Sequence, residues 1–146
     1  MNRIWWKRAA LTIALIVTTA SVGVGAAPSP AAATANVCTS ISGVPGDHMC
    51  TRVVGSGTHV EYARPAVYRV NPQSICNYYA TFTVYNSAGT KIYTATSAYH
   101  KGCLFAALFA SRQINVYRSF PNNSRACGSW FQDGGRLGTA CATLHS

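Results

Sequence analysis

The chain has 146 residues, six cysteines and a formal net charge of +9, with 12 basic and only three acidic residues. Without the signal described below, about 111 residues remain, enough for one modest core but not for two domains. The scarcity of acids also argues against a glycosidase with paired carboxylates. Asp47 and Asp133 stand in turn-like sequence, and only Glu61 lies in a strand-like segment.

The N-terminal region, residues 1–35, has the order of a secretory signal peptide. A cationic start precedes an apolar run of about 16 residues, which gives way to small residues and prolines. A retained membrane anchor is the alternative, but a spanning helix needs about 20 apolar residues. We expect cleavage after Ala35; the alternative, after Ala27, would leave Pro28 directly beyond the cut.

The expected mature domain, residues 36–146, keeps nine basic and three acidic residues, a net charge of +6. We therefore predict a secreted, extracellular protein, of bacterial origin by the alanine-rich character of its signal, with no stable membrane insertion after cleavage. The domain contains all six cysteines: Cys38, Cys50, Cys76, Cys103, Cys127 and Cys141. An even number of cysteines in a small exported domain, with no C-x-x-C pair, predicts disulfides rather than a metal site.

The first strand-like segment of the domain is Thr58–Val70, which Pro65 interrupts. A proline at this point suits an edge strand or a break between two short strands. The next segment, Asn77–Tyr85, alternates between two faces, with Tyr78, Ala80, Phe82 and Val84 on one of them. A turn signal at residues 86–89 then leads into a second strand at Lys91–Tyr99, which predicts a hairpin.

The following segments are Cys103–Ser111, a short apolar run, and Ile114–Phe120, which has the composition of a strand. The apolar run fits either a buried strand or one or two turns of helix. Together with a hairpin at the C-terminus, these segments make about seven short strands. The sequence therefore predicts an all-β fold, a small antiparallel β-sandwich or barrel fastened by three disulfides.

The C-terminal hairpin predicts one disulfide from its register. Its strands, at residues 126–132 and 136–145, flank Asp133-Gly134-Gly135, whose glycines allow a tight turn. A three-residue loop would place Gln132 opposite Arg136 and Cys127 opposite Cys141, within bonding distance. Cys76–Cys103 fits the central hairpin with an offset of two or three residues, and Cys38–Cys50 follows by elimination.

One group of residues suggests catalysis. His59, Glu61 and Arg64 lie within six positions of a predicted strand, and they could supply an acid, a base and a phosphate clamp of ribonuclease type, with His100 as a second histidine. The structural alternative is an exposed strand with a cross-strand ion pair, and it is favoured because such a cluster often arises by chance. The histidines show no metal-binding spacing, and no cofactor motif is present.

A second group interleaves tyrosine with arginine: Tyr62, Arg64, Tyr68, Arg69, Tyr117 and Arg118, followed by Arg125. The structural alternative, solubilising arginines and tyrosines common in β-sheets, is favoured over a binding role. Residues of these types form protein interfaces and attract polyanions. We therefore expect a monomeric, non-catalytic binding protein, whose partner is a protein or an anionic polymer of the cell envelope. The alternatives are the small secreted ribonuclease and an antagonist (toxin or protease inhibitor) that presents residues 47–52 on a loop.

Overall fold

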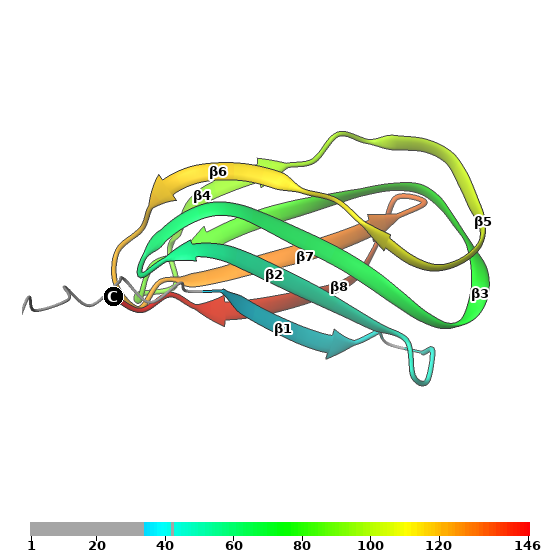
Figure 1. Cartoon of the computed structure of the whole chain (residues 1–146), viewed down its shortest axis with the longest axis horizontal. Coiled ribbons are helices and arrows are strands. Elements are labelled where there is room, and N and C mark those ends of the chain that lie inside the picture. Colours follow the sequence, from blue (N-terminus) through cyan, green and yellow to red (C-terminus); the bar gives the residue numbers. More distant parts are fainter. Residues whose placement is uncertain (1–33, 42) are drawn as a thin grey trace, which may run out of the picture.

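The computed structural model describes residues 34–41 and 43–146, and these residues form an antiparallel β-structure without a helix (Figure 1). The expected signal peptide falls outside them, except for its last two residues. Eight strands are present: β1 Ala35–Ser40, β2 His48–Ser56, β3 His59–Tyr85, β4 Lys91–Thr96, β5 His100–Ser111, β6 Ile114–Ser119, β7 Arg125–Gln132 and β8 Gly135–Thr143. In the described part of the chain, no helix is long and apolar enough to span a membrane.

Strand β3 is the spine of the fold, because its 27 residues pair with five other strands. Its first half pairs with β2 on one edge and with β5 and β6 on the other. Its second half pairs with β7 on one edge and with β4 and β5 on the other. Figure 1 shows β3 and β5 curving together around one end of the molecule, and this bend folds the sheet back on itself.

The folded sheet makes two layers around one core. One layer contains β1, β2, β6 and the first half of β3, and the other contains β8, β7, β4 and the second half of β3, while β5 pairs with both halves of β3. Trp130, Phe82, Met49 and Val67 fill the space between them and are fully buried. The outermost strands β1 and β8 lie against each other, so the sheet is nearly closed, like a barrel (Figure 1). The predicted all-β sandwich or barrel is thus confirmed.

Pro65 does not break the strand, contrary to expectation. It pairs with Thr51 in the interior of β3, and its carbonyl accepts a hydrogen bond from the Arg112 N–H at 3.0 Å. In an antiparallel strand, the N–H and C=O of one residue point to the same neighbour. The missing donor of Pro65 therefore faces the short gap between β5 and β6, where no ladder hydrogen bond is lost.

The central hairpin follows the sequence closely. Tyr78, Ala80, Phe82 and Val84 are buried, and the residues between them are only partly buried. The predicted turn is also present, since the Gly89 N–H donates to the Asn86 carbonyl at 2.9 Å. Alternation is a dependable signal here because one face of the strand is the core itself.

The C-terminal hairpin corrects one detail of the prediction. Its loop has two residues, Asp133 and Gly134, rather than three, so Gln132 faces Gly135. The register then shifts by one residue between Trp130 and Phe131, and this bulge places Cys127 opposite Cys141 as expected. The sequence gives the cysteine register correctly, whereas the bulge that produces it is not visible in the residue pattern.

All three predicted disulfides are present: Cys38–Cys50, Cys76–Cys103 and Cys127–Cys141. Each joins residues that stand directly opposite on neighbouring strands. The pairing of β3 with β5 is irregular on both sides of Cys76 and Cys103. These shifts account for the offset of two or three residues between the register of the central hairpin and the position of this disulfide. The disulfides therefore fasten strands within the sheet and do not join its two layers.

Two segments differ from their predicted structure. Residues 48–52 belong to strand β2, with Met49 and Thr51 fully buried, so they do not form the presented loop of an antagonist. The apolar run at residues 103–111 is a strand, as one alternative held, but most of it is exposed rather than buried. It extends around the end of the molecule, beyond the cover of the second layer.

Candidate functional site

The residues of the suggested ribonuclease site lie apart. His59 pairs with Ser119 at one end of β3, while His100 pairs with Tyr78 in the opposite layer. Arg112 shows that His100 lies near Pro65 rather than near His59. Its N–H donates to the Pro65 carbonyl, and its guanidinium lies over the ring of Tyr78, the partner of His100. His59 is six residues from Pro65 along β3, roughly 20 Å at the rise of a strand.

The local contacts of these histidines are structural in kind. His59 Nδ1 is 3.1 Å from the Ser119 hydroxyl oxygen, and the His100 ring stacks on Tyr78 with centroids 4.6 Å apart. Glu61 is exposed at an irregularity of the register and has no partner on either neighbouring strand: Val60 and Tyr62 pair with the consecutive residues Gly55 and Val54 of β2, and with Arg118 and Asn115 of β6. These placements give no shared centre for an acid, a base and a substrate phosphate.

A different group of residues meets on the outer face of the first layer. Arg52 of β2 stands directly opposite Arg64 of β3, and a shallow hollow of about 340 Å³ opens beside them. The hollow is lined by Thr34, Asn36, Cys50, Arg52, Arg64, Tyr68 and Phe109. We call this surface the arginine–aromatic face. The alternation of β2 and β3 brings its residues together, since positions 50 and 52 and positions 64 and 68 point outward.

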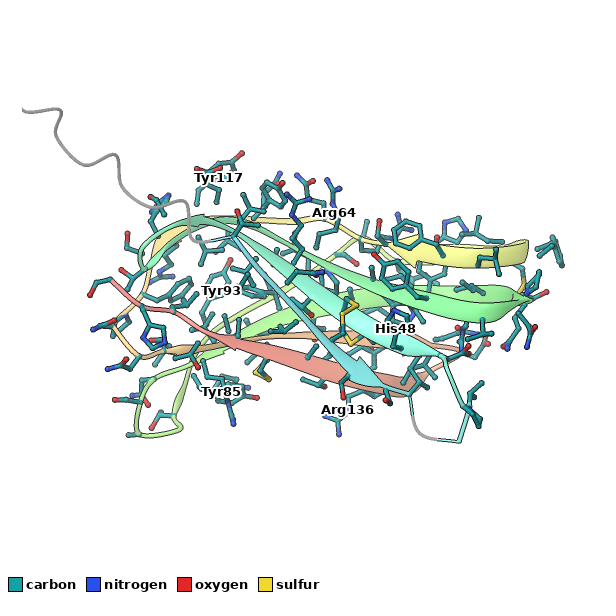
Figure 2. The ribbon with its side chains drawn as sticks, turned by 60° about the horizontal axis from the view of Figure 1, so that its bottom comes forward. His48, Arg64, Tyr85, Tyr93, Tyr117 and Arg136 are labelled. Atoms are coloured by element: carbon teal, nitrogen blue, oxygen red, sulfur yellow. A yellow bond between two sulfur atoms is a disulfide. The ribbon has the colours of Figure 1, made fainter. Side chains whose placement is uncertain are left out.

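Aromatic rings border the two arginines. Tyr68 contacts Phe109 with ring centroids 4.9 Å apart, and His48 stacks on the other side of Tyr68 at 5.0 Å, with the planes 7° apart. The Arg64 guanidinium lies 5.7 Å from the centre of the Tyr62 ring and donates a 2.7 Å hydrogen bond to Gln113 Oε1. These contacts orient Arg64 while it remains exposed, as in Figure 2, where it projects from the ribbon.

The electrostatics of this face are one-sided. Like charges directly opposite in a sheet destabilise it, and opposite side chains stand about 5 Å apart at Cβ. In the part of the chain that the structure describes, the only ion pair is Arg69–Asp47, at 2.8 Å, and it is buried. Neither Arg52 nor Arg64 therefore has a carboxylate partner among these residues. An anion bound between them would remove the repulsion and form charge-assisted hydrogen bonds.

Arg69 faces the interior, although the sequence groups it with the binding residues. Its side chain is only 5% exposed, and it donates hydrogen bonds to Asp47 Oδ2 at 2.8 Å and Gln132 Oε1 at 3.2 Å. The Val70 N–H donates to the other oxygen of Asp47, also at 2.8 Å. The hydrogen bond from Arg69, supported by the one from Val70, holds the pKa of the Asp47 carboxyl below its usual range.

The remaining binding candidates lie on β6. Tyr117 is 70% exposed, and Arg118 lies over the Tyr93 ring at 5.6 Å. Figure 2 shows Tyr117 projecting from the same margin of the ribbon as Arg64, with Tyr85 at the opposite margin. The structure thus places Tyr62, Arg64 and Tyr68 together and leaves Tyr117 and Arg118 outside the hollow.

Three members of the arginine–aromatic face were missed by sequence reasoning: His48, Arg52 and Phe109. Residues 48–52 were taken for a loop because buried Thr51 conceals the apolar face of β2, and Phe109 was assigned to the core with the rest of its run. Only Met49 and Val53 are apolar at alternate positions, with Thr51 between them, so the residue pattern carries little strand signal here.

Metal and thiol chemistry find no support in the described residues. There, no three His, Cys, Asp or Glu side chains are grouped so as to hold a metal ion, and no cysteine is free. Comparison with known proteins adds no assignment, because no family model and no curated protein matches the chain.

Proposed function

We propose that this protein is a secreted, non-catalytic binding protein that recognises an anionic polymer of the cell envelope through its arginine–aromatic face. The observation that carries the proposal is the direct opposition of Arg52 and Arg64 beside a hollow lined by Tyr68 and Phe109, with neither arginine paired to an acid among the described residues. Two guanidinium groups bind phosphate or carboxylate in a bidentate manner, and the rings cover the apolar parts of a repeating unit.

The proposed location rests on two features. Three disulfides in a small domain are compatible with an oxidising, extracellular compartment. Residues 1–35 supply the expected export signal, and the intact mass of the protein from culture medium tests it, since cleavage after Ala35 predicts Asn36 as the first residue. A monomer suffices, because one chain supplies every lining residue of the hollow, and cleavage after Ala35 would remove only Thr34 from that lining.

Binding to two polymers of known chemistry tests the function. Long-chain polyphosphate and poly-glutamate would be titrated into the oxidised domain by calorimetry at low and at physiological salt. Arg52→Ala and Arg64→Ala are each expected to weaken the binding of the better polymer about tenfold, the usual effect of losing a hydrogen-bonded charge. Binding should also weaken as salt rises, because counterions compete for the arginines.

Arg125→Ala is the matched control. Arg125 is exposed and lies over the Tyr85 ring at 5.2 Å, as Arg64 lies over Tyr62, but it belongs to β7 in the other layer. The Arg125→Ala substitution removes the same charge as the other two. Because Arg125 lies away from the hollow, we expect it to weaken binding by less than about twofold. Equal losses in all three variants would mean that net charge alone drives binding. No binding to either polymer would count against an anionic ligand and return a protein partner to consideration.

A further inference from the structure

The end of the molecule at which β3 and β5 bend carries an unusual group of exposed apolar side chains. Val70, Leu104, Phe105 and Leu108 are 59%, 36%, 79% and 50% exposed. We call these four residues the apolar end. All four lie on the β3–β5 ribbon: Leu104 and Phe105 are consecutive on β5, and Val70 and Leu108 lie in the irregular stretch between the Tyr68–Phe109 and Gln73–Ala107 pairs. Contiguous exposed apolar patches of this kind mark interaction sites.

The backbone explains why consecutive residues are exposed here. Neighbouring side chains of a strand normally point to opposite faces, so one of each pair would be buried. Gly102 and Ala106 interrupt the regular strand backbone, since their φ angles are 95° and 50°. Residues with a side chain, such as Ala106, rarely adopt a positive φ. Beyond the overlap of the two layers, both faces of the β3–β5 ribbon are open, and Leu104 and Phe105 are both exposed as a result.

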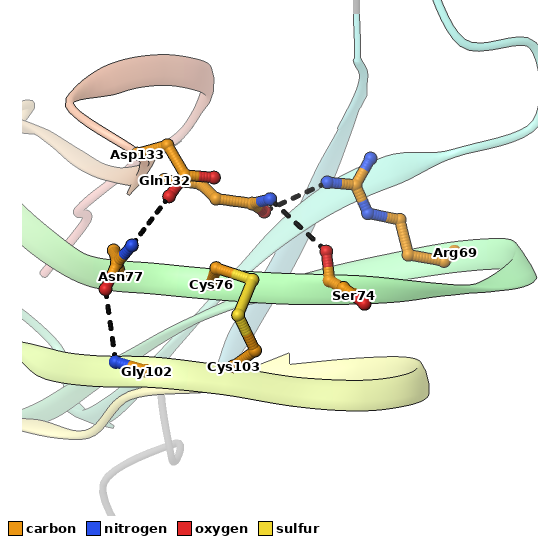
Figure 3. Close-up of a disulfide and its surroundings, with 8 residues drawn as sticks. All are labelled: Arg69, Ser74, Cys76, Asn77, Gly102, Cys103, Gln132 and Asp133. Atoms are coloured by element: carbon orange, nitrogen blue, oxygen red, sulfur yellow. Dashed lines mark hydrogen bonds between the residues drawn. A yellow bond between two sulfur atoms is a disulfide. The ribbon is translucent and has the colours of Figure 1, made fainter.

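The base of the apolar end is rigidly held. The Cys76–Cys103 disulfide joins β3 to β5 next to Leu104, and Asn77 accepts a hydrogen bond from the Gly102 N–H at 3.1 Å (Figure 3). The Asn77 side chain also donates to Asp133 Oδ1 at 2.9 Å, which attaches the β7–β8 turn. The apolar side chains are therefore presented on a fixed support.

Charge near the apolar end favours one kind of partner. Lys101 is exposed beside Gly102, at the base of the apolar end. Of the acids here, Asp47 is paired with Arg69 and Asp133 is hydrogen-bonded to Asn77, while the described residues together carry nine basic and three acidic side chains. Exposed large apolar residues next to cations suit the interface of a membrane with anionic lipids.

We propose that the apolar end docks the protein reversibly on an anionic lipid bilayer, with Phe105 and Leu108 entering the headgroup region. This surface adjoins the arginine–aromatic face at the Tyr68–Phe109 pair but shares no residue with it, so each proposal is tested with its own variants. A second copy of the chain fits less well. These four partly exposed side chains present well under the 800 Å² or so that each partner buries in a standard interface, and two copies would repel each other.

Flotation with vesicles tests the proposal. The oxidised domain would be mixed with vesicles of equal parts phosphatidylglycerol and phosphatidylcholine, or of phosphatidylcholine alone, with no polymer present. We expect binding to the first kind and at least about tenfold weaker partitioning to the second. Phe105→Ser and Leu108→Ser are each expected to reduce partitioning to anionic vesicles about tenfold.

Tyr117→Ser is the matched control, because Tyr117 is an aromatic residue on β6 with 70% exposure. Its partitioning should change by less than about twofold, and all three variants should unfold at the parent's temperature since the replaced groups are exposed. A Phe105→Trp variant gives a second readout. Its emission should shift to shorter wavelength with anionic vesicles, whereas Trp130 is fully buried and supplies a constant background.

Three outcomes would overturn the proposal. The first is no flotation with anionic vesicles. The second is flotation that Phe105→Ser and Leu108→Ser leave unchanged, which would assign binding to the cations alone. The third is self-association in the ultracentrifuge that Phe105→Ser abolishes, without vesicle binding, which would identify a second copy as the occupant. Failure of the polymer titrations would leave the vesicle result unaffected, so the two proposals fail separately.

Discussion

Replacing Asp47 with asparagine isolates the one ion pair of the described residues and tests how much it stabilises the fold. Asparagine has nearly the same shape and keeps a carbonyl oxygen for the Val70 N–H. It removes the negative charge that faces Arg69 at 2.8 Å. The Arg69 side chain, 5% exposed, would keep Gln132 as a hydrogen-bond acceptor, while its Nε already lacks a partner.

The expected loss in the free energy of unfolding is about 3 kcal/mol at pH 7. Removing one partner of a buried ion pair generally costs about 3–5 kcal/mol, because the other charge is left uncompensated. The lower end of this range applies here, since Arg69 retains one hydrogen bond and the pair lies toward one end of the molecule. Converting Arg69 to methionine in the Asp47→Asn background should restore most of the loss, because no buried charge then remains.

The effect should depend on pH in a definite direction. The pKa of Asp47 is lowered in the folded state, so its contribution is fully present above the unfolded value of about 3.9. It is lost as the pH falls through the lower, folded-state pKa, where the carboxyl becomes protonated. The stability difference between the parent and Asp47→Asn should therefore be constant from pH 7 to about 5 and shrink below about 4.

Urea unfolding of the oxidised domain, followed by the fluorescence of Trp130, measures these differences at each pH. A loss below about 1 kcal/mol at pH 7 would refute the argument that the pair is effectively buried. A difference between the two proteins that persists unchanged to pH 2 would show that its origin is not the charge of Asp47. Equal stability of the single and double variants would show that Arg69 does not suffer from losing its partner.

Two further predictions concern the core and the disulfides. Gly128→Ala should destabilise the domain by about 2–3 kcal/mol in urea unfolding. Its Cβ would lie 2.7 Å from Thr51 Cγ2 and 3.0 Å from Pro65 Cγ in the opposite layer. Gly138→Ala is the control, because its Cβ would stand 3.6 Å from Met49, and its expected loss is below about 0.5 kcal/mol. Losses of the same size in both variants would show that the contact with Thr51 and Pro65 is not what excludes a side chain at Gly128. Replacing both cysteines of a disulfide with serine should cost about 3 kcal/mol, and Cys76–Cys103, which spans 27 residues, should cost about 0.7 kcal/mol more than Cys38–Cys50, which spans 12. The reverse order would contradict a loop-entropy origin.

The sequence predicts most of the second layer and less of the first. Asn77–Tyr85 alternates without interruption because one face of β3 is the core and the other is partly covered. Strand β2 escaped prediction, since a threonine occupies a fully buried position opposite Gly128. Periodicity detects a strand only where buried positions carry apolar residues, and here shape complementarity across the layers selects Thr51.

The length of β3 and the exposure of β5 could not be read from the residues. By local rules Pro65 indicates a break, because it has no backbone N–H to donate. In the structure this position faces the gap between the end of β5 and the start of β6, so no hydrogen bond is lost there. The apolar run at residues 103–111 has the composition of a core strand. It is exposed because the bend takes it past the second layer, and a bend of this kind depends on pairings between distant segments.

The same topology gives the disulfides a role in both proposed surfaces. Strands at the edge of a sheet have one free side and open first. Each disulfide of this protein fastens such a strand: β1 to β2, β5 to β3, and β8 to β7. Cys38–Cys50 holds the strand that borders the hollow beside Arg52, and Cys76–Cys103 holds the one that carries Phe105. Reduction of the oxidised domain should therefore loosen both surfaces, and it should also lower the stability of the whole domain, because each bond restricts the unfolded chain.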